Sequence, residues 1–264
     1  MNIAIRHLMK LFLPKGPCLL CSNDSKAGPA AGICRKCWRE RRKIEGPKCP
    51  CCGTPLPRVD GQAEHLCGAC LADPPSFEGH VSVYSYSGPA RRIVLLYKDK
   101  KRYPLARLMG AAVARAVRKR WPDKRWDVIV PVPSPLRRRL VRGFEPAGLM
   151  AKEVASRLNV PLASGLELRR TPAPQKELTV AGRRTNVKGA FVAKPQVARG
   201  KSVLLIDDVT TTGATIREAA KALKRVGAEV HAATFAMTLR RDLDLYTAEE
   251  ARGEKGQRSE GVRR

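Results

Sequence analysis

The sequence has few aromatic residues and no long hydrophobic run. Phe, Trp and Tyr make up 5% of its 264 residues, which disfavours a nucleic-acid binder that stacks many bases on aromatic rings. No apolar segment approaches the roughly 18 residues that a membrane-spanning helix needs. The longest candidate, Ile3 to Leu13, is interrupted by Arg6 and Lys10 and has apolar residues at helical spacing. It predicts a short amphipathic helix rather than a signal peptide, and we expect a cytoplasmic protein.

Acidic residues are also scarce relative to basic ones. Asp and Glu total 24 against 51 Lys and Arg, which gives a net charge of +27. Such an excess favours polyanionic ligands, and the shortage of aromatic rings makes contacts with phosphates the expected use of this charge. With 43% hydrophobic and 28% charged residues, the chain falls in the class of soluble globular proteins rather than disordered or membrane proteins.

Charge and composition divide the chain into three parts. Residues 1–75 have a net charge of +6 and contain every cysteine, so we expect an N-terminal helix and a metal module there. Residues 76–239 have a net charge of +20 and mix strand and helix patterns, which indicates an α/β domain. Residues 240–264 carry almost no apolar periodicity and are expected to form a polar, disordered tail.

Eight of the nine cysteines form four CxxC pairs, separated by 12, 11 and 14 residues. Two thiolates of such a turn converge on one metal ion, and two turns complete a tetrahedral zinc site. We therefore predict two structural zinc ions. The predicted ligands are Cys18, Cys21, Cys34 and Cys37, with Cys49, Cys52, Cys67 and Cys70.

The pairing of these four turns is open at the level of sequence. A sequential arrangement joins the first pair with the second and the third with the fourth, whereas a cross-braced arrangement joins the first with the third. Disulfides and an iron–sulfur cluster are weaker alternatives for this spacing. Cys51 is a ninth thiol that we interpret as a spare residue rather than a ligand.

The segment Ser202 to Thr215 reads SVLLIDDVTTTGAT and carries the clearest chemical signal. Ser202 to Ile206 has the apolar pattern of a strand buried on both faces of a parallel sheet. Ile216 to Val226 has the apolar period of a helix, which ends at Gly227. The residues between them form a loop at the carboxyl end of a strand and the start of a helix, where backbone amides attract a phosphate.

Two carboxylates, Asp207 and Asp208, precede this loop. They can accept hydrogen bonds from a pair of ribose hydroxyls, directly or through a divalent ion. A ribose carrying a 5-phosphate is therefore the predicted ligand. A P-loop is excluded because the segment lacks the GK[ST] ending.

The segment IDDVTTTGAT resembles the phosphoribosyl pyrophosphate (PRPP) signature of type I phosphoribosyltransferases. The resemblance implies that Asp207 and Asp208 are the catalytic acids, which hold the ribose hydroxyls together with Mg²⁺. It also implies a mostly parallel α/β sheet of the type I phosphoribosyltransferase kind. The loop residues that would bind PRPP are Thr210, Thr211, Thr212, Gly213, Ala214 and Thr215.

The four CxxC pairs, VPVPSPLRRRLVRGF (130–144) and QKELTVAGRRTNVKGAF (175–191) resemble the ComF/ComFC family of competence proteins more closely. That family combines a double zinc ribbon with a phosphoribosyltransferase domain, and the similarity covers about residues 8–239. One departure stands out. The family commonly has Asn and Gln after the RGF triplet, where this chain has Glu145 and Pro146.

Basic residues flank the expected site. A second strand pattern, Asp127 to Val132, leads into a basic run in which Arg137 is placed to meet a pyrophosphate. Arg183 and Arg184 fall in a different segment, which is similar to the mobile catalytic loop of such transferases. A further basic run precedes a helix expected at about Leu105 to Arg120. We assign DNA phosphates to the remaining basic residues, although a solvated charged face is an equally simple interpretation. These residues are Lys98, Lys100, Lys101, Arg102, Arg138, Arg139 and Arg142.

Two functions follow from these patterns. The first is a ComF-like factor in DNA uptake during natural transformation, with PRPP as ligand and single-stranded DNA and competence-machinery proteins as partners. The second is a metabolic enzyme that transfers ribose 5-phosphate from PRPP to a base or amine with the help of Mg²⁺. The sequence identifies no acceptor.

Overall fold

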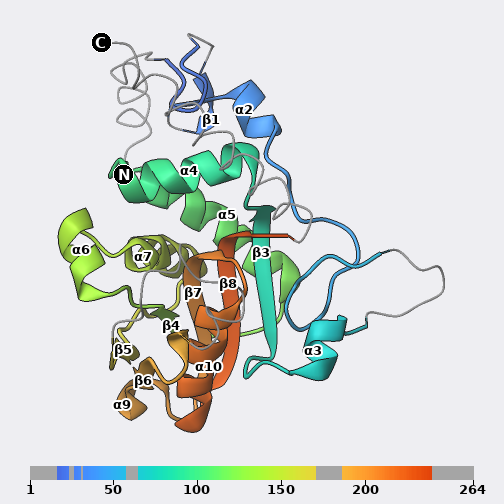
Figure 1. Ribbon diagram of the computed structural model, residues 1–264, viewed down its shortest axis with the longest axis vertical. Helices are drawn as coiled ribbons and strands as arrows, with labels where there is room; N and C mark the ends of the chain where they lie inside the picture. The colour runs from blue at the N-terminus through green and yellow to red at the C-terminus, as the bar shows by residue number, and fades with distance from the viewer. Residues whose placement is uncertain (1–16, 24–26, 31, 58–64, 171–185, 240–264) are drawn as a thin grey trace, which may run out of the picture.

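The computed structural model describes residues 17–23, 27–30, 32–57, 65–170 and 186–239. Its centre is a sheet of four strands, and every neighbouring pair in it is parallel (Figure 1). Parallel strands need crossover connections, which place helices on the faces of the sheet. In spatial order the strands are β3 (Gly79–Ser85), β8 (Glu229–Met237), β7 (Ser202–Thr210) and β4 (Val128–Pro131).

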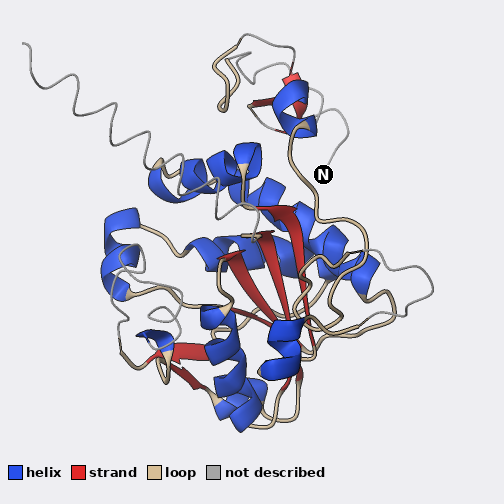
Figure 2. Ribbon diagram, turned by 45° about the vertical axis from the view of Figure 1, so that its right-hand side comes forward, coloured by secondary structure: helices blue, strands red, loops and turns tan. Residues whose placement is uncertain are grey.

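Alternate residues of each central strand belong to two separate hydrophobic cores. Leu204 and Ile206 of β7 pack in the core formed with one group of helices, whereas Val203 and Leu205 pack in the core on the other face, under α10. Because helices cover both faces of the sheet, side chains on both sides of β7 are buried, which accounts for its continuous apolar run. The helices of the first face are α4 (Gly88–Asp99), α5 (Leu105–Arg120) and α7 (Pro146–Leu158), and the second face carries α10 (Ala214–Arg225) (Figure 2).

Two smaller pieces complete the α/β domain. The antiparallel strands β5 (Leu166–Leu168) and β6 (Phe191–Ala193) lie beside α10, followed by the short helix α9 (Pro195–Ala198). Helix α6 (Leu136–Arg142) follows β4 and has no buried residue. It therefore presents its side chains to solvent rather than to a core.

The cysteine module packs against the edge strand β3 rather than standing apart. The Ile44 amide donates to the Val83 carbonyl at 3.1 Å, and the Ser85 amide donates to the Arg42 carbonyl at 2.8 Å. These bonds cover an edge that would otherwise be open to other strands. The module contains a two-stranded sheet and two one-turn helices: β1 (Ala27–Ala30), β2 (Ile33–Cys34), α2 (Arg35–Arg39) and α3 (Gly68–Ala72).

The predicted elements exist, with corrected boundaries. The strand expected over Ser202–Ile206 continues to Thr210 because Asp207, Val209 and Thr210 pair with β8. The two acids therefore lie within the strand rather than after it. The helix expected from Ile216 begins at Ala214, and the strand expected over Asp127–Val132 is shortened at both ends. The helix expected at Leu105–Arg120 has those bounds.

Three predictions fall outside the described residues. They concern the N-terminal helix over residues 3–13, the loop arginines Arg183 and Arg184, and the tail 240–264. Within the described ranges, no helix combines the length and the apolar character needed to cross a membrane.

Candidate functional site

The cysteines gather into two tetrads, and the pairing is sequential. Within each tetrad, the four sulfur atoms lie within 4.8 Å of one another. The first tetrad joins the first CxxC pair with the second, and the second tetrad joins the third with the fourth, so the cross-braced arrangement is wrong. Cys51 belongs to neither tetrad, and its thiol lies 3.8 Å from the Phe77 carbonyl oxygen.

The surroundings of the sulfur atoms suit zinc thiolates. The Cys34 amide lies 3.3 Å from the sulfur of Cys18, and the Cys67 amide lies 3.4 Å from that of Cys49. Burial raises the pKa of Cys49, but hydrogen bonds from the amides of Cys52 and Cys67 outweigh this effect and lower the pKa to about 7, whereas burial raises the pKa of Cys52 to about 11. Four convergent sulfurs with amide donors are the ligand set of a structural zinc ion, so each tetrad fits one.

We predict two zinc ions per chain. Metal analysis of protein purified without chelator measures the ratio directly. Replacing Cys49 and Cys52 by Ser should remove one of the two ions and leave the other, because each tetrad is complete in itself. A wild-type ratio of one or zero would contradict the two-ribbon architecture.

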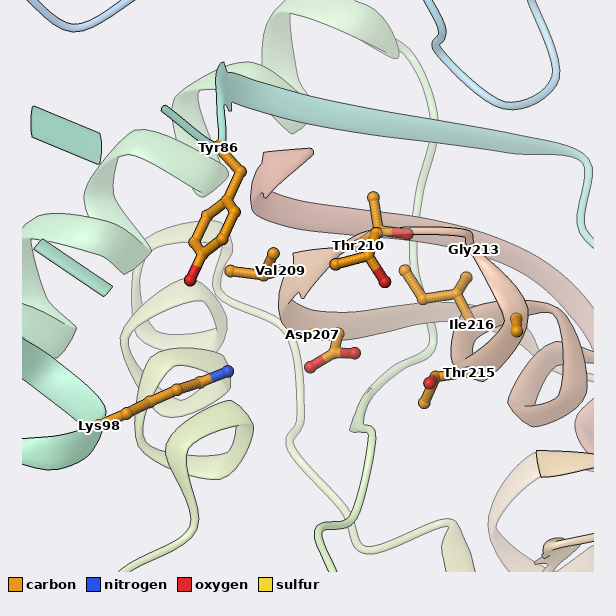
Figure 3. A pocket seen from close by; sticks show the side chains of 10 residues that line it. Tyr86, Lys98, Asp207, Val209, Thr210, Gly213, Thr215 and Ile216 are labelled. Carbon is orange, nitrogen blue, oxygen red and sulfur yellow. The ribbon is translucent and has the colours of Figure 1, made fainter. Parts of the chain in front are cut away.

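Asp207 and Asp208 lie at the carboxyl end of β7, where a pocket opens (Figure 3). Asp207 lines this pocket, whereas Asp208 is only 4% exposed. The Asp208 amide donates to Oδ1 of Asp207 at 2.8 Å, which fixes the orientation of the first carboxylate. Burial raises the pKa of Asp207 well above its ordinary value, and the neighbouring Asp208 carboxylate raises it further.

The loop after β7 forms the opposite wall of the pocket. Gly213 adopts φ 76°, a left-handed conformation that favours glycine, and α10 begins at the next residue. Thr212 lies in this turn, where its Oγ1 accepts from the Ala214 amide at 3.4 Å. The loop and helix residues that line the pocket are Thr210, Thr211, Gly213, Ala214, Thr215 and Ile216. Hydroxyls and the amides of a helix N-terminus converge there, which suits a phosphate group.

Four pocket residues were not predicted from the sequence as members of this site. Val209 and Ile216 directly neighbour predicted residues, whereas Lys98 and Tyr86 come from other elements. Lys98, assigned above to DNA, reaches the pocket from the last turn of α4, and its Nζ lies 2.7 Å from Oδ1 of Asp208. Tyr86 follows the end of β3 and lines the same pocket. Figure 3 shows both side chains on the wall facing the Thr/Gly loop. Tyr86 could have been identified from its position directly after a strand, because the carboxyl ends of parallel strands lie at the same edge of the sheet as the pocket.

The ion pair between Lys98 and Asp208 gives a stability prediction. Replacing Lys98 by Met leaves the buried Asp208 carboxylate without its cation, and we expect a loss of about 2 kcal/mol in the free energy of unfolding, since Lys98 is partly exposed. Chemical denaturation of zinc-loaded protein measures this loss. The double variant Lys98→Met/Asp208→Asn should recover most of it, and additive losses would contradict the pairing.

Glu145, at the position where the family pattern departs, holds the turn after β4. Its Oε2 accepts from the Ser134 amide at 3.0 Å, and the Ser134 hydroxyl donates to the same carboxylate. Arg139 of α6 pairs with it at 3.6 Å. Pro146 is the first residue of α7, a position that proline favours. The substituted pair therefore has a clear local role, in which an acid fastens the β4–α6 turn and a proline begins the next helix.

The structure brings the two basic runs assigned to DNA side by side. Nη2 of Arg142 lies 3.9 Å from Oδ1 of Asp99, and the rings of Tyr103 and Phe144 meet edge-to-face at 4.8 Å. The end of α4 and the end of α6 therefore share one surface, which we call the α4–α6 basic surface. Its members are Lys100, Lys101, Arg102, Arg137, Arg138, Arg139 and Arg142. Arg137 is exposed on α6 and is not among the residues that line the pocket.

Comparison with known proteins agrees with this architecture. The phosphoribosyl transferase domain model matches residues 106–249, and the double zinc ribbon domain model matches residues 8–71. The chain is 34% identical to the DNA utilization protein YhgH of Escherichia coli (strain K12), over 81% of this chain and 92% of that protein. It is 31% identical to competence protein F of Haemophilus influenzae, over 75% of this chain and 86% of that protein.

The chain belongs to the ComF family. Competence protein ComFC of Bacillus subtilis is a further relative, with 27% identity over 83% of this chain and 93% of that protein. The fold is accordingly the type I phosphoribosyltransferase fold preceded by a double zinc ribbon. Membership also accounts for the joint presence of two cysteine tetrads and an acid pair beside a Thr/Gly loop in one chain.

Proposed function

We propose that this ComF family protein binds PRPP with Mg²⁺ and binds single-stranded DNA, and that it acts in DNA uptake during natural transformation in the cytoplasm. The observation that carries the PRPP part is the pocket in which Asp207 and the Thr/Gly loop face each other beside Lys98. The carboxylates would hold the ribose hydroxyls and the hydrated cation, while the loop and helix amides would hold the 5-phosphate. The role in DNA uptake is supported by the names of the competence and DNA utilization relatives.

The α4–α6 basic surface supports the DNA part of this proposal. It carries seven basic side chains, more than one PRPP molecule can neutralise, and it continues from the α4 turn that places Lys98 in the pocket. A strand that follows this surface would pass beside the pocket. The same helix α6 exposes three aliphatic side chains that a competence-machinery protein could cover, so a protein partner is the competing occupant. They are Leu136, Leu140 and Val141.

A second candidate function is transfer of ribose 5-phosphate from PRPP to a base or amine. The observation in its favour is that Asp207 and five residues of the Thr/Gly loop line one pocket, with Asp208 buried next to Asp207. A protein that only binds DNA has no need of this set. Mg²⁺ would supply charge neutralisation at the pyrophosphate, and the residues of this chain would orient the ribose.

Calorimetric titration with PRPP, with and without Mg²⁺, tests the ligand. Ribose 5-phosphate and pyrophosphate serve as partial ligands, and binding of PRPP tighter than either is expected because the pocket offers partners to both ends of the ribose. A screen of bases, nucleotides and DNA for pyrophosphate release then separates the two functions. Release with a free base or amine favours the metabolic transferase, whereas PRPP binding without release favours a ligand-binding role in DNA uptake. Absence of PRPP binding would refute both.

A further inference from the structure

Arg217 connects the helix of the phosphate pocket to the second cysteine tetrad. It lies in the first turn of α10, and its side chain is 18% exposed. Its Nη1 donates to the Asp73 carbonyl at 2.8 Å and lies 3.3 Å from Oδ2 of the same residue. Its Nη2 lies 3.9 Å from the sulfur of Cys70. The guanidinium of Arg217 therefore contacts both Cys70, a predicted zinc ligand, and Asp73, which follows it in the chain.

The backbone of Arg217 belongs to the pocket side of the same turn. Its amide donates to the Gly213 carbonyl at 2.9 Å, which closes the first turn of α10 onto the loop. The residues just before it, Thr215 and Ile216, line the pocket. Arg217 therefore belongs to the same helical turn as residues that line the pocket.

The second ribbon is held on the sheet by independent contacts. Nδ1 of His80 lies 2.9 Å from the Cys52 carbonyl oxygen, and Nε2 lies 3.1 Å from Oγ1 of Thr234 on β8. A Cβ added at Gly53 would meet the His80 carbonyl oxygen at 2.6 Å, so the knuckle and β3 are in close backbone contact. Because these contacts fix the second ribbon to β3 and β8, the ribbon and α10 already lie at a defined distance from each other, and Arg217 bridges them.

We propose that Arg217 is a positioning residue that couples the zinc ion of the second tetrad to the first turn of α10, and through it to the phosphate pocket. With zinc bound, the Cys70 thiolate accepts a charge-assisted contact and the Asp73 carbonyl stays in place. Loss of zinc removes the metal that orders so small a module, and the first turn of α10 then loses the contacts that Arg217 makes with Asp73 and Cys70. Because coupling between two binding sites is reciprocal, a ligand in the pocket raises the affinity of the second tetrad for zinc. This last statement rests on the proposed binding of PRPP.

The test compares Arg217→Ala with Arg217→Lys and with the matched control Lys224→Ala. The Lys224→Ala substitution removes the same charge from the same helix. Lys224 pairs with Glu78 at 3.4 Å, and both side chains of this pair are exposed to solvent. Hydrogen exchange of the amides of residues 212–218 measures the local stability of the first turn of α10, and it needs no bound ligand. Release of zinc to a coloured chelator reads the tetrad, and calorimetry with PRPP reads the pocket.

For Arg217→Ala we expect about tenfold faster amide exchange in the first turn of α10, about tenfold faster release of one of the two zinc ions, and about tenfold weaker PRPP binding. Arg217→Lys should be intermediate, because a lysine keeps the charge but lacks the fork that reaches two acceptors. Lys224→Ala should match the wild type in all three measurements.

The coupling would be overturned if Arg217→Ala and Lys224→Ala showed the same rates of amide exchange and of zinc release. Faster zinc release with unchanged amide exchange in the first turn would also overturn it, because Arg217 would then serve the tetrad alone. A wild-type protein that binds no PRPP refutes the proposed function instead, and the exchange and zinc measurements still decide the coupling.

Discussion

Replacing both Asp207 and Asp208 by Asn is expected to weaken PRPP binding at least a hundredfold. Each carboxylate would accept a charge-assisted hydrogen bond from a ribose hydroxyl or the hydrated cation, and such bonds contribute about 1.5 to 3 kcal/mol each. Two of them amount to about 3 kcal/mol or more, which corresponds to a factor of a hundred or greater in affinity. Calorimetric titration of the double variant with PRPP and Mg²⁺ measures this loss.

The single variant Asp207→Asn separates the ligand effect from a folding effect. It leaves the ion pair between Lys98 and Asp208 intact, so the fold should be as stable as in the wild type while PRPP affinity falls by tenfold or more. A control that neutralises two exposed acids outside the pocket, Asp123→Asn with Glu45→Gln, should bind PRPP normally. If the double variant at the acid pair binds as tightly as this control, the ligand site lies elsewhere.

The acid pair and the loop were accessible from the sequence because all their members lie within one short segment. A buried strand, two carboxylates and a Thr/Gly turn before a helix specify one local geometry, and only the end of the strand and the start of the helix differ from the prediction. The apolar pattern ends at Ile206, but β7 continues because its neighbour β8 offers backbone partners up to Met237. Backbone hydrogen bonding between neighbouring strands leaves no mark on side-chain hydrophobicity, and the extra length was therefore not predictable.

The cysteine spacing predicted two metal sites but not their pairing. Both arrangements use the same four turns, and the choice depends on which turns the intervening chain brings together. In this protein, β2 leads directly into the second turn, and the Cys34 amide points at Cys18. That local contact pairs neighbouring turns and leaves the third and fourth to form the second tetrad.

Lys98 shows where sequence reasoning reached its limit. It stands in a run with Lys100, Lys101 and Arg102, and nothing in that run distinguishes it from a surface residue. The final turn of α4 points Lys98 inward to Asp208, which is more than a hundred positions later in the chain, while its basic neighbours stay outside. Arg217 and Asp73 are equally remote in sequence. Contacts of this kind depend on how helices pack on the sheet, and periodicity carries no information about them.

Single-stranded DNA is expected to bind to the α4–α6 basic surface with a steep dependence on salt. Each neutralised phosphate contributes about −0.7 to the slope of log K against log salt on single strands, so seven contacts give a slope of about −5. Affinity should then fall about a thousandfold between 50 and 200 mM salt. Sequence preference should be weak, because phosphates are the main contacts and few aromatic rings are available for stacking. Fluorescence polarisation with labelled oligonucleotides measures both properties.

Charge reversal on α6 tests where this surface lies. Changing Arg137, Arg138 and Arg139 to Glu removes three phosphate contacts, so affinity at low salt should fall by orders of magnitude and the slope should flatten by about 2. A control with the same change in net charge places Glu at three exposed basic positions away from α6, namely Arg199, Lys221 and Arg225. Equal losses in the two triple variants would mean that total charge, rather than this surface, governs binding. Unchanged DNA binding in the α6 variant would instead assign the helix, with its exposed Leu136, Leu140 and Val141, to a protein partner.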